Sequence, residues 1–334
     1  LRFTPPETAE LLQQILGETV DDETVALLTE RTEGWPAGLR MAAMSLRVAS
    51  DHRQFARKYT ESGHRLVSDY LLNEVLDGLP GEHRALLLRT SILHRMCAPL
   101  IDVLAGDAMP ESDGYDFLEM LWSDNFFLIA LDNQGVWYRY HHLFRQLLQK
   151  QLGRAFSQEV VAAMHRQASR WFENAGFVED AVFHALQAHD EEHAAIIVEN
   201  HVHEPLNQEE WRLVERWINL LPAEARPRPG LLASQAMIAQ FRYRVDRVFS
   251  LLDAAQEGLE GGAYAYTAAQ EQAWMGVVNT FRTLMWGPES TPEESLRYAE
   301  LALQQVDPGT KYVRSVAELG QVVALQMAGD GPGA

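Results

Sequence analysis

The feature that most constrains the fold is an aromatic stretch at residues 136–144, which predicts a short strand that runs directly into a helix. A second apolar run, residues 126–131, precedes it, and the polar residues 132–135 between the two runs are typical of a tight turn. The two runs are therefore predicted to pair as a β-hairpin. Apolar residues then recur at three- and four-residue spacing, which predicts a helix immediately after the hairpin. These residues are Leu143, Phe144, Leu147, Leu148 and Leu152.

Two histidines, His141 and His142, stand at the predicted start of this helix. Unpaired backbone N–H groups and the helix dipole favour an anion at such a point, and an imidazole can add a directed donor. A histidine can equally serve there as a structural cap that binds no ligand. The residues by themselves leave both interpretations open.

Length and charge limit the architecture and the partners. At 334 residues the chain is longer than one hydrophobic core usually supports, so two or three domains are expected. Acidic residues outnumber basic ones, 47 to 28, and the formal net charge is -19. Such a charge opposes binding to a phosphate backbone, so any DNA contact is expected to lie outside this chain.

Cysteine content and apolar runs bear on the compartment. The single cysteine, Cys97, excludes an internal disulfide framework and fits a reducing environment. No apolar run approaches the roughly twenty residues that a membrane span needs, and the N-terminus lacks a secretory pattern. A cytoplasmic location with no membrane partner is therefore expected.

Residues 1–62 are predicted to form a small all-helical unit. Thr4 with Glu7 three residues on, and proline between them, predicts a helix start, and Gly17 predicts its end. A second helix is expected to close at Gly34, and Pro36 is suited to begin a third. Three helices are too few for an independent core, so this unit is interpreted as part of a larger domain.

Residues 63–153 are predicted to form a winged-helix domain. A helix marked by Val67, Leu71 and Val75 is expected to end near Gly78, and further helical segments lead to the hairpin and its closing helix. Helices followed by a two-stranded wing and a closing helix describe this fold. Its helices carry no cluster of arginine and lysine that would follow phosphates, which argues against DNA binding.

Residues 154–334 are predicted to form consecutive helical hairpins. Apolar stripes and short turns alternate without strand signals, and Thr291 with Glu294 predicts one of the helix starts. A right-handed α-superhelix of the tetratricopeptide type is expected, because one hairpin cannot bury its own apolar face. Four tryptophans are predicted as core anchors of the stacked helices. They are Trp211, Trp217, Trp274 and Trp286. The fold class is thus mainly α.

The chain lacks recognisable catalytic motifs. It contains no Gly-x-x-x-x-Gly-Lys-[Ser/Thr] phosphate loop, so no catalytic residue is expected. Five histidines lie close together in sequence, and His189 and His193 would share a helical face, which is the basis for a metal-hydrolase alternative. The five are His184, His189, His193, His201 and His203. One cysteine leaves only imidazole and carboxylate ligands, and surface histidines are common, so no metal site is expected.

Four segments carry a resemblance to a known family. They are Glu-Gly-Trp-Pro-Ala-Gly-Leu-Arg at residues 33–40, Tyr-Leu-Leu-Asn-Glu-Val-Leu at residues 70–76, Leu-Leu-Arg-Thr-Ser at residues 87–91 and Trp-Tyr-Arg-Tyr-His-His-Leu-Phe at residues 137–144. In order and spacing they closely resemble the MalT-like large ATP-binding LuxR-family regulators. The resemblance covers the whole chain, most strongly in residues 1–200.

This family belongs to the signal-transduction ATPases with numerous domains. The resemblance implies a phosphate-loop domain and helical lid, then a winged helix, a helical-repeat sensor and a C-terminal helix-turn-helix. Residues 1–62 would be the lid end of the nucleotide-binding domain, residues 63–153 the winged helix, and residues 154–334 an incomplete sensor. The chain would then lack the core of the phosphate-loop domain and the helix-turn-helix.

The resemblance also implies roles for particular residues. Gly34, Trp35 and Pro36 are similar to the Gly-x-Pro motif, whose proline packs beside adenine in related ATPases. The segment Tyr140-His141-His142 is similar to their Met-His-Asp motif, which makes His141 the candidate contact to the ADP β-phosphate. Histidine replaces the aspartate at residue 142, so a role that needs that carboxylate does not carry over.

These expectations combine into a regulatory function. The chain is predicted to be the middle segment of an ATP-dependent transcriptional activator, which senses ATP or ADP through the lid and winged helix. A small-molecule inducer or regulatory protein would bind the helical repeats, and DNA would be bound only through the C-terminal domain. The complete protein would be a slow signalling ATPase, whereas this chain by itself would not be an enzyme. The alternative is a helical-repeat protein-binding scaffold with no nucleotide linkage.

Overall fold

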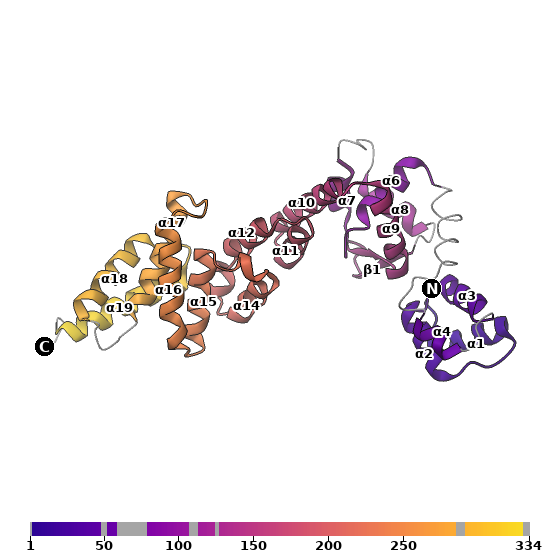
Figure 1. Ribbon diagram of the computed structural model, residues 1–334, viewed down its shortest axis with the longest axis horizontal. Helices are drawn as coiled ribbons and strands as arrows, with labels where there is room; N and C mark the ends of the chain where they lie inside the picture. The colour runs from indigo at the N-terminus through magenta and orange to yellow at the C-terminus, as the bar shows by residue number, and fades with distance from the viewer. Residues whose placement is uncertain are drawn as a thin grey trace. The chain divides into compact units, whose positions relative to one another are not determined.

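The chain divides into two compact units, Leu1–Gln167 and Ala168–Ala334, in a computed structural model (Figure 1). The structure describes residues 2–47, 52–58, 79–106, 113–123, 127–284 and 291–329. The division falls inside a single helix, α10. The boundaries predicted after residues 62 and 153 remain predictions. Each unit is described by itself.

The first unit begins with a group of helices, and local capping accounts for the starts of α1 and α2. They are α1 (Pro5–Leu16), α2 (Asp22–Arg31), α3 (Pro36–Leu46) and α4 (His52–Lys58). The Glu7 carboxylate accepts the N–H of Thr4 at 2.7 Å, which confirms the predicted start of α1. Gly17 ends that helix in the left-handed conformation, with φ 80°, as predicted. Asp21 caps α2 by accepting the N–H of Thr24.

A hairpin and its surrounding helices complete the first unit. The elements are α6 (Gly81–Thr90), α7 (Ala98–Ala105), α8 (Gly114–Ser123), β1 (Leu128–Ala130), β2 (Tyr138–Tyr140) and α9 (His142–Ala155). The two strands are antiparallel, with Leu128 opposite Tyr140 and Ala130 opposite Tyr138. The helix marked by Val67, Leu71 and Val75 lies outside the described residues, as does residue 126 of the first predicted strand.

The second strand is shorter than predicted, because the turn competes for its first donors. The carboxylate of Asp132 accepts the N–H groups of Gln134, Val136 and Trp137, at 3.0, 3.1 and 2.9 Å. The N–H of Trp137 therefore belongs to the turn, although its carbonyl still accepts the N–H of Leu131 at 2.8 Å, and the strand begins at Tyr138.

Tyr140 and the apolar stripe of α9 hold the hairpin against the helices. Tyr140 and Phe144 are fully buried, and their rings meet edge to face with centroids 5.7 Å apart. The Tyr140 hydroxyl lies 2.7 Å from the Thr90 hydroxyl of α6, so its polar end is satisfied inside the core. Burial of Leu147, Leu148 and Leu152 confirms the predicted helical face. The last residue of β2 is thus fixed where α9 begins.

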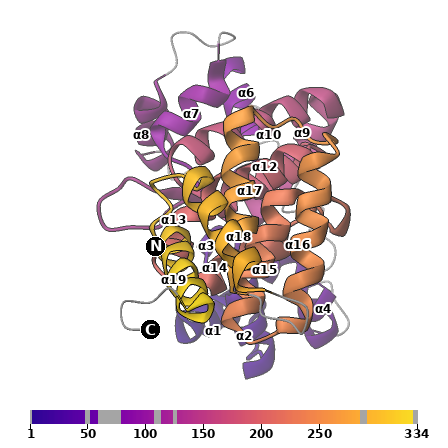
Figure 2. The same cartoon turned by 90° about the vertical axis from the view of Figure 1, so that its left-hand side faces the viewer.

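In the part of the chain that the structure describes, the second unit consists of helices, most of them joined by short turns (Figure 2). They are α10 (Gln158–Asn174), which begins in the first unit, α11 (Val178–Gln187), α12 (Glu191–His201), α13 (His203–Asn207), α14 (Trp211–Leu220), the 3₁₀ turn η3 (Ala223–Ala225), α15 (Pro229–Phe241), α16 (Val245–Glu260), α17 (Ala268–Thr283), α18 (Pro292–Gln305) and α19 (Lys311–Ala328). Successive helices pack as pairs, most extensively α15 with α16, α17 with α18, and α18 with α19. The predicted helical hairpins are confirmed, and the right-handed superhelix remains a prediction.

Two of the four tryptophans behave as predicted. Trp217 and Trp274 are buried core residues of α14 and α17. Trp211 was predicted to be a core anchor, but it is only partly buried at the start of α14, where guanidinium groups of Arg212 and Arg242 lie over its ring. Trp286 lies outside the described residues. The prediction for Trp211 was wrong because the indole packs against arginine at the surface.

Among the described residues, no helix combines the length and apolar content that crossing a membrane requires.

Candidate functional site

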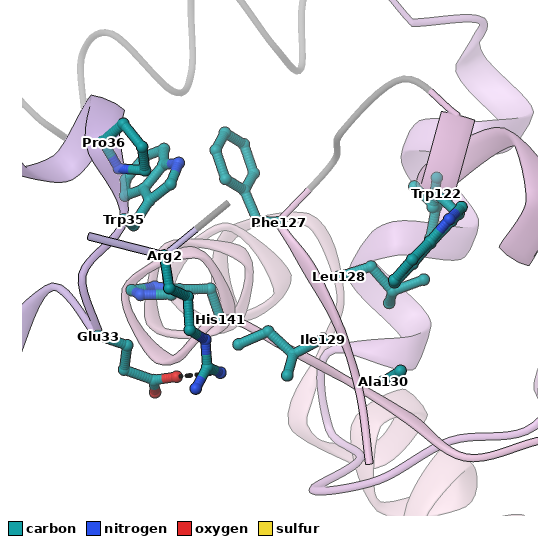
Figure 3. Close-up of a pocket in the computed structure, with 11 residues that line it drawn as sticks. Arg2, Glu33, Trp35, Pro36, Trp122, Phe127, Leu128, Ile129, Ala130 and His141 are labelled. Carbon is teal, nitrogen blue, oxygen red and sulfur yellow. Dashed lines mark hydrogen bonds and ion pairs between the residues drawn. The ribbon is translucent and has the colours of Figure 1, made fainter. Parts of the chain in front are cut away.

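The structure brings together the residues that the sequence singled out at two distant positions. Trp35 and Pro36, at the start of α3, and His141, at the start of α9, line one pocket of about 710 Å³ in the first unit. Figure 3 shows Trp35 and Pro36 on one side of this pocket and Trp122 of α8 on the other. The walls are largely apolar, and Arg2 and Glu33 add charge at one place. The pocket could accommodate a flat ring with a polar substituent.

Gly34 does not line the pocket but shapes the turn that enters it. Its backbone is left-handed, with φ 68°, and its carbonyl accepts the N–H of Phe3 at 2.7 Å. A Cβ at this position would clash with the carbonyl oxygen of Phe3. Glycine is therefore required at residue 34, both because of the left-handed backbone conformation and because the backbone of Phe3 lies so close. The result is a sharp turn that presents Glu33 and Trp35 toward the hairpin.

Aromatic rings join this turn to the hairpin. The ring of Trp35 meets the ring of Phe127 edge to face, with centroids 4.5 Å apart. The centroid of the His141 imidazole lies 5.5 Å from that of the Trp35 ring. Gly38 lies directly below the indole, where a Cβ would fall 2.5 Å from a ring carbon. The indole is therefore held between the first turn of α3 and the residue that leads into β1.

The charged contacts converge on the Glu33 carboxylate. Arg139 of β2 donates two hydrogen bonds to it, at 3.1 and 2.7 Å, and Nδ1 of His142 lies 3.0 Å from the same group. Arg2 adds a third partner at 3.2 Å. Burial alone would raise the pKa of Glu33, but the hydrogen bonds from Arg139 and His142 prevail and lower it to about 2. We call these four residues the Glu33 junction.

His141 makes a second link between the same two segments. Its Nε2 lies 2.6 Å from the carbonyl oxygen of Thr32, and its Nδ1 accepts the N–H of Leu143 at 3.3 Å. This pair of contacts fits the neutral tautomer with the proton on Nε2. Burial lowers the pKa of His141 to about 4, which keeps the ring neutral near pH 7. In this structure His141 is a helix cap with both ring nitrogens in use.

The junction also has the donor spacing of a metal site. Among the described residues, Glu33, His141 and His142 offer three ligand atoms that all lie within 4.8 Å of one another. The guanidinium of Arg139 already occupies the carboxylate, and a cation would have to displace it or share the space with it. Electrostatics therefore favours an ion-pair junction over a divalent-metal site.

The five histidines of the second unit have other surroundings. His184 is buried and stacks on Phe172 with centroids 5.4 Å apart. Nδ1 of His201 lies 2.8 Å from the carbonyl oxygen of Ile197, and His203 stacks on Trp274. The surroundings of these three histidines support a structural interpretation. The prediction that His189 and His193 share a helical face was wrong, because His189 lies in the turn between α11 and α12 with φ 57°. His193 is on α12, where its Nε2 lies 3.6 Å from the Glu173 carboxylate.

Glu33 and Arg139 were not recognised as functional candidates from the sequence. Glu33 appeared only as the first residue of the Glu-Gly-Trp-Pro segment, and Arg139 only inside the aromatic strand. They are 106 positions apart, so neither periodicity nor spacing could pair them. The one local signal was the arginine between two tyrosines of a strand, where a charge needs a partner if the strand is half buried.

Acidification from pH 7 to pH 5 is expected to lower the free energy of unfolding of the first unit. The folded-state pKa of His141 is about 4, against an ordinary value of 6.5, so the unfolded chain binds more protons in this window. The stability present above pH 6.5 is therefore lost as the pH falls toward 4. His165, whose pKa burial also lowers to about 4, acts in the same direction. Each histidine is expected to contribute on the order of 2 kcal/mol of the loss at pH 5.

Urea unfolding at pH 7 and pH 5 measures this effect. His141→Asn keeps a capping side chain but removes the titrating group, so it should reduce the loss by on the order of 2 kcal/mol. The other groups around the ring are Glu33, His142 and Arg139, and Glu33 stays ionised throughout this window because its pKa is about 2. An identical loss in the variant and the unmodified chain would contradict the assignment.

The chain is similar to known proteins over most of its length. Residues 72–160 match the family model for the MalT winged helix domain. The chain is 30% identical to the HTH-type transcriptional regulator MalT of Serratia proteamaculans over 319 residues and to that of Vibrio cholerae over 321 residues. Each match covers 95% of this chain and 34% of the relative, so the chain spans about a third of the length of these relatives. Taken with the hairpin and helices of the first unit, these similarities show that the chain is MalT-like, with a winged helix domain of the MalT type.

Proposed function

We propose that this chain is the regulatory middle segment of an ATP-dependent transcriptional activator. The similarity to proteins named as HTH-type transcriptional regulators supports a regulatory rather than a catalytic role. In this proposal the nucleotide state is sensed through residues 1–62 and the winged helix. An inducer or regulatory protein binds the helical repeats of residues 154–334. The complete protein acts in the cytoplasm.

The observation that carries the proposal is the paired linkage between the α2–α3 turn and the start of α9. The Glu33 junction and the His141–Thr32 contact both join the Trp35–Pro36 side of the pocket to the winged-helix side. A ligand that enters this pocket must therefore act on both sides at once. Such a site can convert occupancy into a change of domain contacts.

The Nε2–H group of His141 could donate its hydrogen bond to a phosphate oxygen instead of the carbonyl oxygen of Thr32. Its Nε2–H now points at a carbonyl oxygen, and a phosphate oxygen is an acceptor for the same tautomer. A β-phosphate of ADP, supplied by a nucleotide-binding domain of the same protein, would replace Thr32 without any change of protonation. Adenine would pack beside Pro36 and Trp35. ATP hydrolysis and DNA binding would belong to other domains of the complete protein.

Hydrogen–deuterium exchange of the complete protein with ADP, with ATP and without nucleotide tests the proposal. Backbone amides of residues 32–35 and 138–143 are expected to exchange at different rates in the three states, because these segments flank the pocket. Amides of α19, far along the chain, provide an internal comparison. Identical exchange of both segments in all three states would favour the alternative, a helical-repeat scaffold without nucleotide linkage.

A further inference from the structure

One segment of the second unit has a charge opposite to that of the whole chain. Residues 212–247 contain seven arginines and no lysine, against three acidic residues, in a chain whose net charge is -19. The segment covers α14, α15 and the start of α16. Arginine presents a planar fork of donors that matches phosphate and carboxylate groups better than lysine does.

Four of these arginines surround one pocket. It has a volume of about 220 Å³ and lies between α14, α15 and the first turns of α16. The arginines come from three places: the segment before α15, the α15–α16 turn and α16 itself. They are Arg226, Arg242, Arg244 and Arg247, and Glu215 is the acidic residue that lines the pocket with them.

Two of the four are fixed by structural contacts. Arg226 donates to the carbonyl oxygens of Leu221 and Asn219 at 2.9 and 3.3 Å, and so caps the end of α14. Arg242 pairs with Glu215 at 2.5 Å and lies over the ring of Trp211, with its guanidinium carbon 4.9 Å from the centroid. These contacts hold the walls of the pocket in place.

The other two retain unused donors. Arg244 approaches Asp246 only at 3.6 Å, and both side chains are more than half exposed, so this pair is weak. The Arg247 guanidinium has no hydrogen bond or ion pair with any other residue in the described part of the chain. Counting Glu215 and Asp246 against the four arginines leaves two positive charges without compensation at this pocket.

We propose that this pocket binds a small dianion through a phosphate or a pair of carboxylates, with Arg244 and Arg247 as its direct ligands. Two uncompensated guanidinium groups match two negative charges, and the volume admits a compact metabolite rather than a polymer. The positive end of α16, which begins at Val245, adds a favourable field for the anion. This inference rests on the proposed function, in which an inducer binds the helical repeats, and it adds the chemical class of that inducer.

Calorimetric titration of the whole chain at fixed ionic strength tests the assignment. Ribose 5-phosphate is expected to bind saturably, whereas ribose, which lacks the phosphate, is expected not to bind. Succinate tests whether a dicarboxylate serves as well as a phosphate. The double variant Arg244→Gln with Arg247→Gln should weaken the binding of the charged probe by at least about tenfold, since two charge-assisted donors are lost.

A matched control separates the pocket from general electrostatics. Arg314→Gln removes the same kind of side chain from α19, where Arg314 pairs with Glu318, and should change affinity by less than about twofold. The proposal would be overturned if neither ribose 5-phosphate nor succinate bound saturably. It would also be overturned if the pocket variant and the control variant lost the same amount of affinity. Nucleotide is absent from this experiment, so its failure would leave the proposed nucleotide control standing.

Discussion

Replacing Glu199 by alanine is expected to lower the free energy of unfolding of the second unit by about 3–5 kcal/mol. Its side chain is 4% exposed and that of its partner Arg228 is 6% exposed, so both charges are removed from water. Arg228 donates two hydrogen bonds to one carboxylate oxygen, at 3.1 and 3.0 Å. The other oxygen accepts from the N–H of Gly230 and the hydroxyl of Tyr266. Alanine would leave the buried guanidinium with only the exposed carboxylate of Glu192, 3.8 Å away, as an acidic partner.

Urea titration followed by circular dichroism measures this loss. Glu179→Ala is the matched control, because Glu179 pairs with Arg216 at the surface of the same unit, where both side chains are about half exposed. The control should cost no more than about 1 kcal/mol. Equal losses for the two variants would show that the Glu199 network does not hold α12 to the start of α15.

Replacing Glu33 by alanine is expected to cost about 2–3 kcal/mol and to weaken the attachment of the α2–α3 turn to the start of α9. The change removes the acceptor shared by Arg139, His142 and Arg2, and leaves all three partners of the junction without their common carboxylate. These side chains are partly exposed, which makes the expected loss smaller than at Glu199. Trp35 and the His141–Thr32 contact would still tie the segments together.

A double-mutant cycle with Arg139→Ala isolates the junction. The coupling energy between Glu33 and Arg139 is expected to be about 1–2 kcal/mol, because their bidentate pair is well aligned. Arg2→Ala removes the third partner, which is more than half exposed, and should change stability by less than about 1 kcal/mol. A coupling energy near zero would mean that Glu33 acts only through its own backbone turn.

Local chemistry accounts for the parts of the fold that the sequence predicted well. The starts of α1 and α18 follow from a capping residue and an acidic residue three positions later. The hairpin follows from two aromatic runs and a polar turn. The length of β2 could not be predicted, because the Asp132 carboxylate accepts the N–H of Trp137, which the register of the hairpin directs toward β1.

Long-range charge pairs were outside the reach of sequence patterns. Glu33 with Arg139, and Glu199 with Arg228, look in the sequence like any surface acid and base, and only the fold shows that they meet. Trp35, Pro36 and His141, which the family resemblance singled out, line one pocket. Their nucleotide roles remain predictions, because His141 here bonds to Thr32 and Leu143.

The most direct test of nucleotide control is to measure ADP affinity and inducer-independent transcription for His141→Ala in the complete protein. Loss of one charge-assisted contact of about 1.5–3 kcal/mol predicts at least about tenfold weaker ADP binding and a comparable rise in basal transcription. His142→Ala, which removes a donor to Glu33 but no predicted phosphate contact, should change ADP affinity less. If His141→Ala lowers thermal stability while ADP affinity and basal transcription stay unchanged, His141 is a structural cap and the account is contradicted.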